Sequence, residues 1–216
     1  LTRLNRDGHL AYPGPDLLAL IALATQIHTA TAGAFDPSIQ PLWLATASNT
    51  DLTEAETGWH RLRASREELR LDPGMALTFN GIAQGFGADA VKAHLAAHGF
   101  DHALIDMGET AALGGPFRLG LQDPVHGHLA TRTLTGTAIA TSSPMATLVN
   151  GQPHILHPMG LPPLWSTVSV EARTAALADA LSTALVFLTA DRIAALRHPG
   201  LIRVTLVGFD GNLQTV

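Results

Sequence analysis

The stretch that decides the fold is Leu77–Glu109, LTFNGIAQGFGADAVKAHLAAHGFDHALIDMGE. Its first residues form a short apolar run of the length typical of a buried strand, so a strand is expected over Leu77–Phe79. Apolar residues then recur at helical spacing, which predicts a helix across about Ile82–His98. Gly99 suits the C-terminal cap of that helix, and Ala103–Ile105 is the next expected strand.

The turn between the first strand and the helix is rich in glycine. Glycine lets a ligand approach bare backbone N–H groups and a helix N-terminus attracts phosphate, although the same glycines also suit a plain turn. A second alternative is a dinucleotide-binding fingerprint, because Gly85–Ala90 matches G-x-G-x-x-A and Asp106 follows roughly twenty residues later. That match is poorly placed, since Gly81 already ends the expected strand and the helix is under way at Gly85.

The composition sets limits on the class of protein. Of 216 residues, 46% are hydrophobic and 14% are charged, which is enough apolar material for one domain or a tightly joined pair. The net charge is −5 and Lys92 is the only lysine, so no nucleic-acid-binding surface is expected. The absence of cysteine excludes disulfides and cysteine nucleophiles. No apolar run has membrane-spanning length, and the lack of an initiator Met or a signal peptide indicates a trimmed chain.

The rest of the chain alternates irregularly between helices, strands and hairpins, which favours an α+β fold with a mostly antiparallel sheet. A helix is expected to start at Pro15, and a strongly apolar helix is expected over Ala175–Leu188. Residues 48–70 are polar and helix-turn-like. Asn150-Gly151 and Asp210-Gly211 are hairpin turn signals. The other expected strands are Phe117–Leu121, Thr137–Thr141, Ser166–Val170, Ile202–Val207 and Gln214–Val216.

A lone acid, Asp179, lies within the apolar helix, where an unpaired carboxylate costs several kcal/mol or loses its charge. Ser182 and Thr183 follow three and four residues later, so the three side-chain oxygens share one face of the helix. An acid with two hydroxyls suits a hard cation such as Mg²⁺. The alternative is that the two hydroxyls bond to their own helix and that Asp179 pairs with an arginine.

Eleven histidines raise the alternative of a zinc site. No H-E-x-x-H motif is present and no cysteine can join them, so ordinary surface or hydrogen-bonded histidines are the better interpretation. The closely spaced pairs are His94 with His98, His126 with His128, and His154 with His157.

Several separate stretches, taken together and in order, resemble the ApbE family of FAD:protein FMN transferases, and within it the NosX-like branch. The matching stretches are Arg3–Arg6, Gly33–Pro37 with Pro41–Trp43, Asn80–Phe86, Ile105–Glu109, Ala140–Ser142, His154–Pro158 and Ala178–Ala184. The resemblance covers nearly the whole chain. It implies a single α+β domain over residues 1–216, related to the tunnelling fold, that lacks the family's N-terminal segment before Arg3.

The resemblance also implies a reaction, in which FMN moves from FAD to a Thr or Ser hydroxyl of a partner flavoprotein and AMP is released. It implies Mg²⁺ as the essential metal and export to the periplasm. NosX-like relatives suggest a membrane flavoprotein of nitrous-oxide respiration as the acceptor.

Site residues are carried over by position in the motifs. The resemblance places the metal on Asp179, Ser182, Thr183 and the backbone carbonyl of Gly81. It places FAD against Ala34, Phe35, Asp36, Thr78, Gln84 and Leu156. His154 matches the motif histidine and is the candidate for proton transfer or phosphate binding.

The chain departs from the family pattern at three of these motifs. His157 stands where the family has Asp, Gln84 where many members have Lys, and Thr78 where Asp is usual. These departures leave two alternatives to transfer open. One is a protein of the same fold that binds or hydrolyses FAD without transferring FMN. The other is an assembly partner of a membrane redox complex with a vestigial site.

Overall fold

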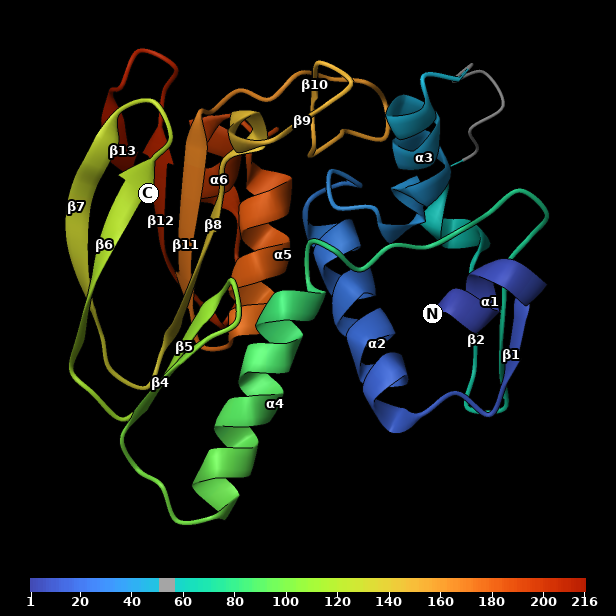
Figure 1. Cartoon of the computed structure of the whole chain (residues 1–216), viewed down its shortest axis with the longest axis horizontal. Coiled ribbons are helices and arrows are strands. Elements are labelled where there is room, and N and C mark those ends of the chain that lie inside the picture. Colours follow the sequence, from blue (N-terminus) through green and yellow to red (C-terminus); the bar gives the residue numbers. More distant parts are fainter. Residues whose placement is uncertain (51–56) are drawn as a thin grey trace. The chain divides into compact units, whose positions relative to one another are not determined.

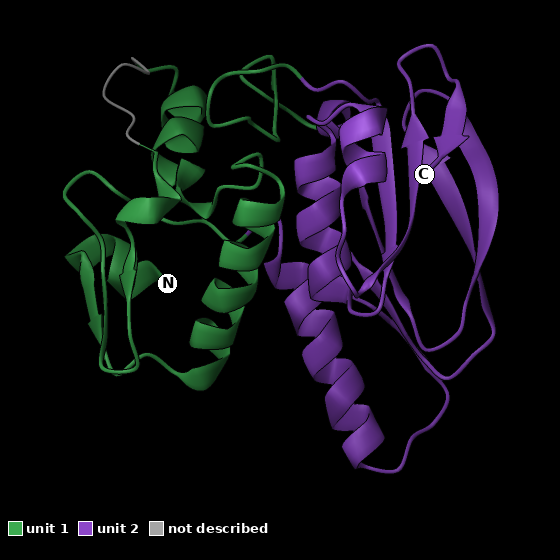
Figure 2. Cartoon of the chain, turned by 180° about the vertical axis from the view of Figure 1, so that it is seen from behind, with its two compact units in different colours: residues 1–79, 147–162 green, residues 80–146, 163–216 purple. Residues whose placement is uncertain are grey.

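The computed structural model describes residues 1–50 and 57–216, which divide into two compact units (Figure 2). Unit 1 comprises Leu1–Phe79 with Thr147–Pro162, and unit 2 comprises Asn80–Ala146 with Pro163–Val216. The chain therefore enters unit 1, passes to unit 2, returns to unit 1 for one short segment and ends in unit 2.

Unit 2 is built on a six-stranded sheet with the order β13-β12-β11-β8-β5-β4, in which every neighbouring pair is antiparallel. Alternation along the strands gives the sheet two apolar faces, so that Ala111 faces one core and Ala112 the other. The strands are β4 (Ala103–Asp106), β5 (Thr110–Leu113), β8 (Ala138–Ser142), β11 (Thr167–Ala172), β12 (Leu201–Val207) and β13 (Leu213–Thr215).

Each face of this sheet is covered by a different structure (Figure 1). Helices α4 (Ala83–Ala97) and α5 (Ala175–Leu185) pack together and against one face, while the short helix α6 (Ala190–Ala195) follows α5. The hairpin of β6 (Phe117–Asp123) and β7 (Gly127–Leu134) packs its apolar residues on the other face. The α+β prediction with a mostly antiparallel sheet is confirmed.

Two residues of α4 hold the N-terminus of α5. A Cβ atom at Gly85 would overlap the backbone carbonyl of Ala175, so only glycine permits this approach of the two helices. The Asp89 carboxylate accepts hydrogen bonds of 2.9 Å from the N–H groups of both Ala175 and Ala176. The glycines of the G-x-G-x-x-A match thus lie inside a helix beside an antiparallel sheet, and the dinucleotide-binding alternative is wrong.

Unit 1 contains helices α1 (Thr2–Asp7), α2 (Pro15–Ala30) and α3 (Gln40–Ser48), with 3₁₀ turns η1 (Pro37–Ile39) and η2 (Trp59–Arg61). Its three-stranded antiparallel sheet has the order β1-β3-β2, from β1 (His9–Ala11), β3 (Glu68–Arg70) and β2 (Arg63–Ala64). The expected helix from Pro15 is confirmed. The Asn150-Gly151 turn is confirmed too, with φ of 47° and 77°, between β9 (Leu148–Val149) and β10 (Gln152–Pro153).

The expected strand over Leu77–Phe79 is wrong, because this segment pairs with no other strand. The side-chain amide of Asn5 takes the place of a neighbouring strand: it donates to the Leu77 carbonyl at 2.7 Å and accepts from the Leu77 N–H at 2.8 Å. The Thr78 N–H donates to the Pro37 carbonyl at 2.8 Å. The apolar run is buried as expected, but its backbone bonds to a side chain and a loop.

Two other expectations need correction. Residues 63–70 of the segment expected to be helix-turn-like form the strands β2 and β3, because they pair with each other and with β1, and residues 51–56 lie outside the described residues. The helix expected over Ala175–Leu188 ends at Leu185, after which Phe187 and Leu188 form a tight turn. Helix α4 and strand β4 confirm the other two elements of the Leu77–Glu109 stretch.

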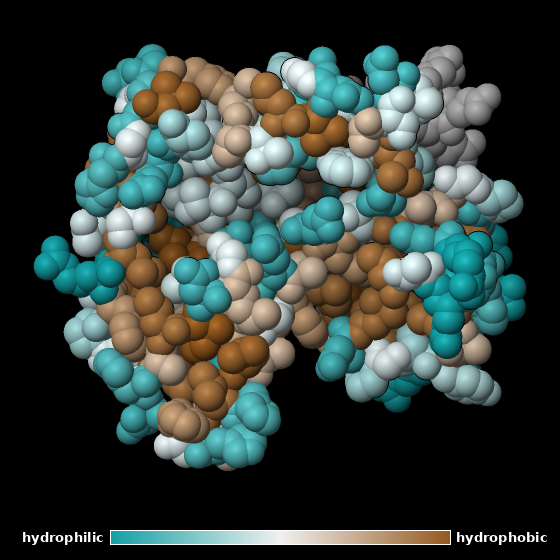
Figure 3. Space-filling view, in the orientation of Figure 1, coloured by the Kyte–Doolittle hydropathy of each residue, from teal (hydrophilic) through white to brown (hydrophobic). Residues whose placement is uncertain are grey.

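The described residues contain no helix long and apolar enough to cross a membrane. Figure 3 shows hydrophobic side chains on the face of unit 2 that carries α4, β4 and β5. Exposed hydrophobic residues of these elements and of the connecting loop are Val91, Phe100, Leu104 and Met107.

Candidate functional site

Asp179 is the only charged residue of α5 and is 3% exposed. Its Oδ2 accepts a hydrogen bond of 3.0 Å from the N–H of Gly85, at the start of α4. No cationic side chain pairs with it in residues 1–50 and 57–216, so the arginine alternative finds no support. Burial raises the pKa of Asp179 to about 7, against the lowering effect of the Gly85 hydrogen bond. Asp179 is therefore an acid that lacks a counter-charge.

A second acid, Glu109, lies in the turn between β4 and β5 and belongs to the same part of unit 2. Its Oε2 accepts a 3.3 Å hydrogen bond from the N–H of Thr141 in β8. Burial raises its pKa to about 8, and the charge of Asp179 contributes in the same direction. Glu109 belongs to the Ile105–Glu109 motif, but the sequence resemblance assigns it no role.

The hydroxyl groups of α5 point to different places. Ser182 is fully buried, and its Oγ donates to the Asp179 backbone carbonyl at 3.0 Å and bonds to Ser142 Oγ at 2.8 Å. Thr183 lies against the glycine turn, because a Cβ atom at Gly81 would be 2.8 Å from Thr183 Oγ1. The structure thus brings Gly81, Thr183 and Asp179 to one end of unit 2, with Ser182 turned toward β8.

These residues offer a cation only oxygen atoms, the donors that Mg²⁺ prefers. The described residues hold no group of three His, Asp or Glu side chains arranged as metal ligands, so hydroxyl and carbonyl oxygens would have to join Asp179. Among the described residues no cationic side chain neutralises Asp179 or Glu109, so a bound cation would be favoured electrostatically. The oxygen donors and this charge together fit Mg²⁺.

Gln84, an expected FAD contact, is exposed on the first turn of α4. Its side-chain amide lies against Gly108 of the β4–β5 turn, where a Cβ atom would come within 2.5 Å of Gln84 Nε2. Gly108 has a φ of 95°, which also favours glycine. Gln84 is thus placed beside the turn that carries Glu109.

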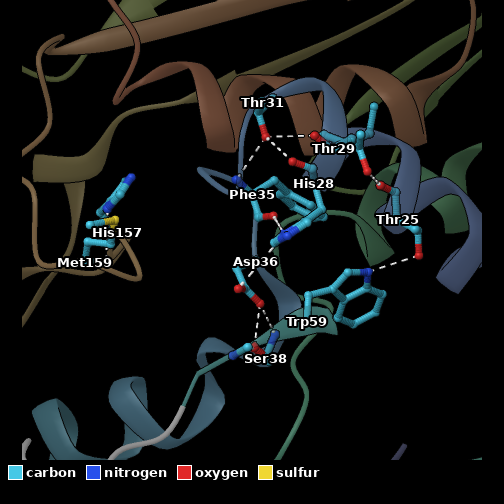
Figure 4. A network of polar contacts seen from close by, with 12 residues as sticks. Thr25, His28, Thr29, Thr31, Phe35, Asp36, Ser38, Trp59, His157 and Met159 are labelled. Carbon is cyan, nitrogen blue, oxygen red and sulfur yellow. Dashed lines mark hydrogen bonds and ion pairs between the residues drawn. The ribbon is translucent and has the colours of Figure 1, made fainter. Parts of the chain in front are cut away.

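In unit 1, the expected FAD contacts Ala34, Phe35 and Asp36 form a tightly bonded segment after α2 (Figure 4). The Thr31 hydroxyl donates to the Ile27 carbonyl at 2.7 Å and accepts from the Phe35 N–H at 3.2 Å. Ala34 and Phe35 are 6% and 5% exposed. The segment is therefore held by hydrogen bonds and packing within the protein.

Asp36 precedes Pro37 and caps the turn that begins there. Its Oδ1 accepts hydrogen bonds from the Ser38 N–H at 2.8 Å and the Ser38 hydroxyl at 2.6 Å, which caps η1. His28, which the sequence analysis missed, donates from Nδ1 to the Phe35 carbonyl at 2.8 Å, and the same Nδ1 lies 4.0 Å from Asp36 Oδ2. Nothing in the sequence singles out His28, because it lies at the end of the apolar helical pattern and in no recognisable motif.

The remaining unit 1 candidates lie on two other segments. Thr78 follows the Asn5-bonded Leu77, and Leu156 is half-buried in the loop after β10. His154 is tied to Thr147, whose carbonyl oxygen accepts from the His154 N–H at 3.2 Å and from its Nδ1 at 3.1 Å. Because a carbonyl can only accept, His154 carries a proton on Nδ1.

His157, which replaces the family's Asp, keeps a bond typical of an aspartate turn. Its Nδ1 accepts the N–H of Met159 at 3.0 Å, two residues further on, as a carboxylate oxygen does in an Asx-turn. The Gly160 N–H donates to the His157 carbonyl at 2.9 Å, which closes the same turn. Burial lowers the pKa of His157, which favours the neutral ring that this acceptor role requires.

The histidine pairs do not assemble a metal site among the described residues. His98 donates from Nδ1 to the His94 carbonyl at 2.8 Å, and their rings stack with centroids 4.2 Å apart at the end of α4. This is the ordinary hydrogen-bonded role that the sequence analysis preferred to zinc.

Comparisons with known proteins agree with this fold. A sequence model described as the ApbE family matches residues 1–204, whereas no curated protein matches the chain. Solved structures are similar as well. The ApbE protein from Thermotoga maritima has a TM-score of 0.83 at 22% identity, over 94% of this chain and 76% of that chain.

Two further solved structures carry functional descriptions. The flavinyl transferase ApbE of Pseudomonas stutzeri, in its apo form, has a TM-score of 0.78 at 24% identity, over 96% of this chain and 73% of that chain. The flavin transferase ApbE from Vibrio cholerae has a TM-score of 0.82 at 21% identity, over 100% of this chain and 79% of that chain. At these identities the likeness establishes a shared fold.

Proposed function

This chain belongs to the ApbE family, and from that membership we propose that it is a flavin transferase that moves FMN from FAD to a Thr or Ser hydroxyl of a partner flavoprotein. The observation that carries the proposal is the pair of carboxyl groups of Asp179 and Glu109 in unit 2, for which the described residues supply no cationic partner. The descriptions of the Pseudomonas stutzeri and Vibrio cholerae proteins as flavinyl and flavin transferases support it.

The reaction is a phosphoryl-type transfer. The acceptor hydroxyl oxygen forms a bond to the phosphorus of the FMN half of FAD, and the bond from that phosphorus to the bridging pyrophosphate oxygen breaks. AMP leaves with that oxygen, and the hydroxyl proton passes to a base. Such a transfer needs positioning and charge stabilisation more than covalent chemistry from the protein.

Asp179, Thr183 and the carbonyl of Gly81 would hold Mg²⁺, and Ser182 would support Asp179 from inside the helix through its bond to the Asp179 carbonyl. Mg²⁺ when bound would neutralise charge on the pyrophosphate. The Gly85 N–H fixes Asp179 Oδ2 and so orients the carboxylate before any ligand arrives.

In unit 1 the candidate FAD contacts are the Ala34–Asp36 segment, Thr78 and Leu156, and in unit 2 the candidate is Gln84. His154 is the candidate base. Its Nδ1 donates to the Thr147 carbonyl at 3.1 Å, so Nε2 is the ring nitrogen that would take up the hydroxyl proton.

A second candidate function is FAD binding or hydrolysis without transfer. It is favoured by His157, which preserves the turn of the family's Asp but cannot supply a negative charge there. We further propose the NosX-like branch, a membrane redox subunit as the acceptor and the periplasm as the compartment, all three from motif resemblance.

Incubation with FAD and Mg²⁺ tests the proposal before any acceptor is known. FAD fluorescence titration measures binding, and chromatography measures release of AMP. We expect binding together with slow AMP release that EDTA stops and that Asp179→Asn lacks. Absence of FAD binding would contradict both candidate functions, whereas binding without AMP release, also when an acceptor is added, would favour the second.

A further inference from the structure

We propose that Glu109 is a second carboxylate of the cation site, so that a divalent cation is held between the β4–β5 turn and helix α5. The proposal deepens the proposed function and rests on it, because it adds a residue to the same site. The sequence resemblance assigns Glu109 no role; the contacts of the folded chain point to it.

Two independent connections direct Glu109 and Asp179 to the same corner of unit 2. Glu109 is held by the N–H of Thr141, and the next residue, Ser142, bonds through its hydroxyl to Ser182 of α5 at 2.8 Å. Ser182 in turn bonds to the Asp179 carbonyl. Strand β8 thus contacts both Glu109 and helix α5, and β8 lies beside α5 (Figure 1).

A third contact comes from α4. Gln84 lies against Gly108, the residue before Glu109, and the Gly85 N–H that follows Gln84 donates to Asp179 Oδ2. The start of α4 therefore touches both the turn and the buried acid. The three elements meet around the two carboxyls.

The hydrogen bonds of the two acids leave acceptor capacity unused. Within the part of the chain that the structure describes, Asp179 accepts one hydrogen bond through its side chain, at Oδ2, although it is 3% exposed. Glu109 accepts one long bond of 3.3 Å, through Oε2. Among the described residues no buried side-chain oxygen lacks a hydrogen-bond partner, so the remaining oxygens of these two carboxyls are accessible from solvent and open to a bound ion. A hard divalent cation would occupy the remaining lone pairs and neutralise both charges.

The test is binding of Mn²⁺, which replaces Mg²⁺ and is detected directly by electron paramagnetic resonance, without turnover. Titrations are run with Mn²⁺ alone and with Mn²⁺ plus FAD. The variants are Glu109→Gln, which keeps an acceptor for Thr141, and Glu109→Asp, which keeps the charge. Asp101→Asn removes one exposed carboxylate from unit 2 and controls for net charge.

We expect Glu109→Gln to bind Mn²⁺ at least tenfold more weakly than wild type, Glu109→Asp to recover part of the loss, and Asp101→Asn to match wild type. Thermal melts of the metal-free variants show that each is folded. Equal Mn²⁺ binding by Glu109→Gln and wild type would overturn the proposal, and so would the absence of saturable binding to wild type in both titrations.

These results separate the proposal from the proposed function. If Mn²⁺ binding does not depend on Glu109 but wild type still transfers FMN, the proposal fails and the function stands. If binding depends on Glu109 but wild type neither releases AMP nor labels an acceptor, the function fails and the cation site stands.

Discussion

At the scale of single residues, the burial of Asp179 opposes the ionisation of its carboxyl group. Because burial raises its pKa to about 7, the folded metal-free protein holds this proton more tightly than the unfolded chain does. The contribution to stability is therefore greatest below the unfolded pKa of about 4 and is lost as the pH rises to about 7. Glu109, with its pKa raised to about 8, acts in the same direction.

Asp179→Asn should remove the part of this pH dependence that comes from Asp179, in the absence of divalent cations, and leave the part that comes from Glu109. Asparagine keeps an oxygen to accept the Gly85 N–H but carries no charge. The free energy of unfolding of the variant should rise relative to wild type by roughly 2–3 kcal/mol between about pH 5 and pH 8, since one pKa unit is about 1.4 kcal/mol. Urea unfolding at both pH values measures it. A variant that is several kcal/mol less stable at every pH would mean that Asp179 has a hidden cationic partner.

The residues of the site were predictable to very different degrees. Asp179 stood out because a lone acid in an apolar helix demands an explanation, and the structure indeed gives it no cation. Glu109 and His28 did not stand out, because their importance comes from contacts across β8 and the Phe35 loop that no local pattern encodes. Whether the predicted ligands bind FAD and Mg²⁺ stays a prediction.

At the scale of elements, the packing of α4 on α5 requires glycine at position 85 but not at position 87. A Cβ atom at Gly85 would overlap the Ala175 backbone carbonyl, which cannot move without shifting α5. At Gly87 it would meet only the end of the flexible Met107 side chain, at 3.3 Å.

Gly85→Ala should therefore destabilise the protein by about 2–3 kcal/mol or prevent folding. Gly87→Ala is the matched control and should be neutral or stabilising by up to about 1 kcal/mol, because alanine favours the helix. Thermal and urea melts of both variants decide this. Equal stability of the two variants would mean that the close approach of α4 to α5 is not required.

A buried acid also joins the β6–β7 hairpin to the sheet. Burial alone would raise the pKa of Asp123, but hydroxyl groups of Ser166 and Thr167 and the N–H groups of His126 and Val125 outweigh it and lower the pKa to about 2. This stabilisation is present above the unfolded pKa of about 4 and is lost as the pH falls toward 2.

Asp123→Asn should cost about 2–3 kcal/mol at neutral pH, because it removes the charge that these four donors share. The difference from wild type should shrink as the pH falls from about 5 to 3. Asp101→Asn, an exposed acid of the same unit, should show no such difference. A loss for Asp123→Asn that is independent of pH would assign the effect to packing instead.

Elements with a clear period were predictable, and those defined by distant partners were not. Helices α2 and α4 follow from apolar spacing, and the Asn150-Gly151 hairpin follows from its turn residues. Leu77–Phe79 has the composition of a strand, yet the Asn5 side chain takes the place of its neighbour. Strands β2 and β3 were not predicted, because residues 63–70 are mostly polar and these strands are defined by their pairing with each other and with β1.

At the scale of the whole molecule, the candidate site residues are distributed over the two units. The rigid Ala34–Asp36 segment and His154 belong to unit 1, whereas Asp179, Thr183 and Glu109 belong to unit 2. Both units are formed by segments distant in the sequence, and the family match extends over residues of both units.

The most direct test of the account is transfer of the flavin itself. Purified protein, FAD and Mg²⁺ are incubated with the purified flavoprotein subunit of a nitrous-oxide respiration complex, and the acceptor band is read by in-gel flavin fluorescence beside AMP release. We predict a fluorescent acceptor whose labelling stops with EDTA, with Asp179→Asn, and with replacement of the acceptor Thr or Ser. FAD bound by the wild type, with neither a labelled acceptor nor AMP released, would contradict flavin transfer.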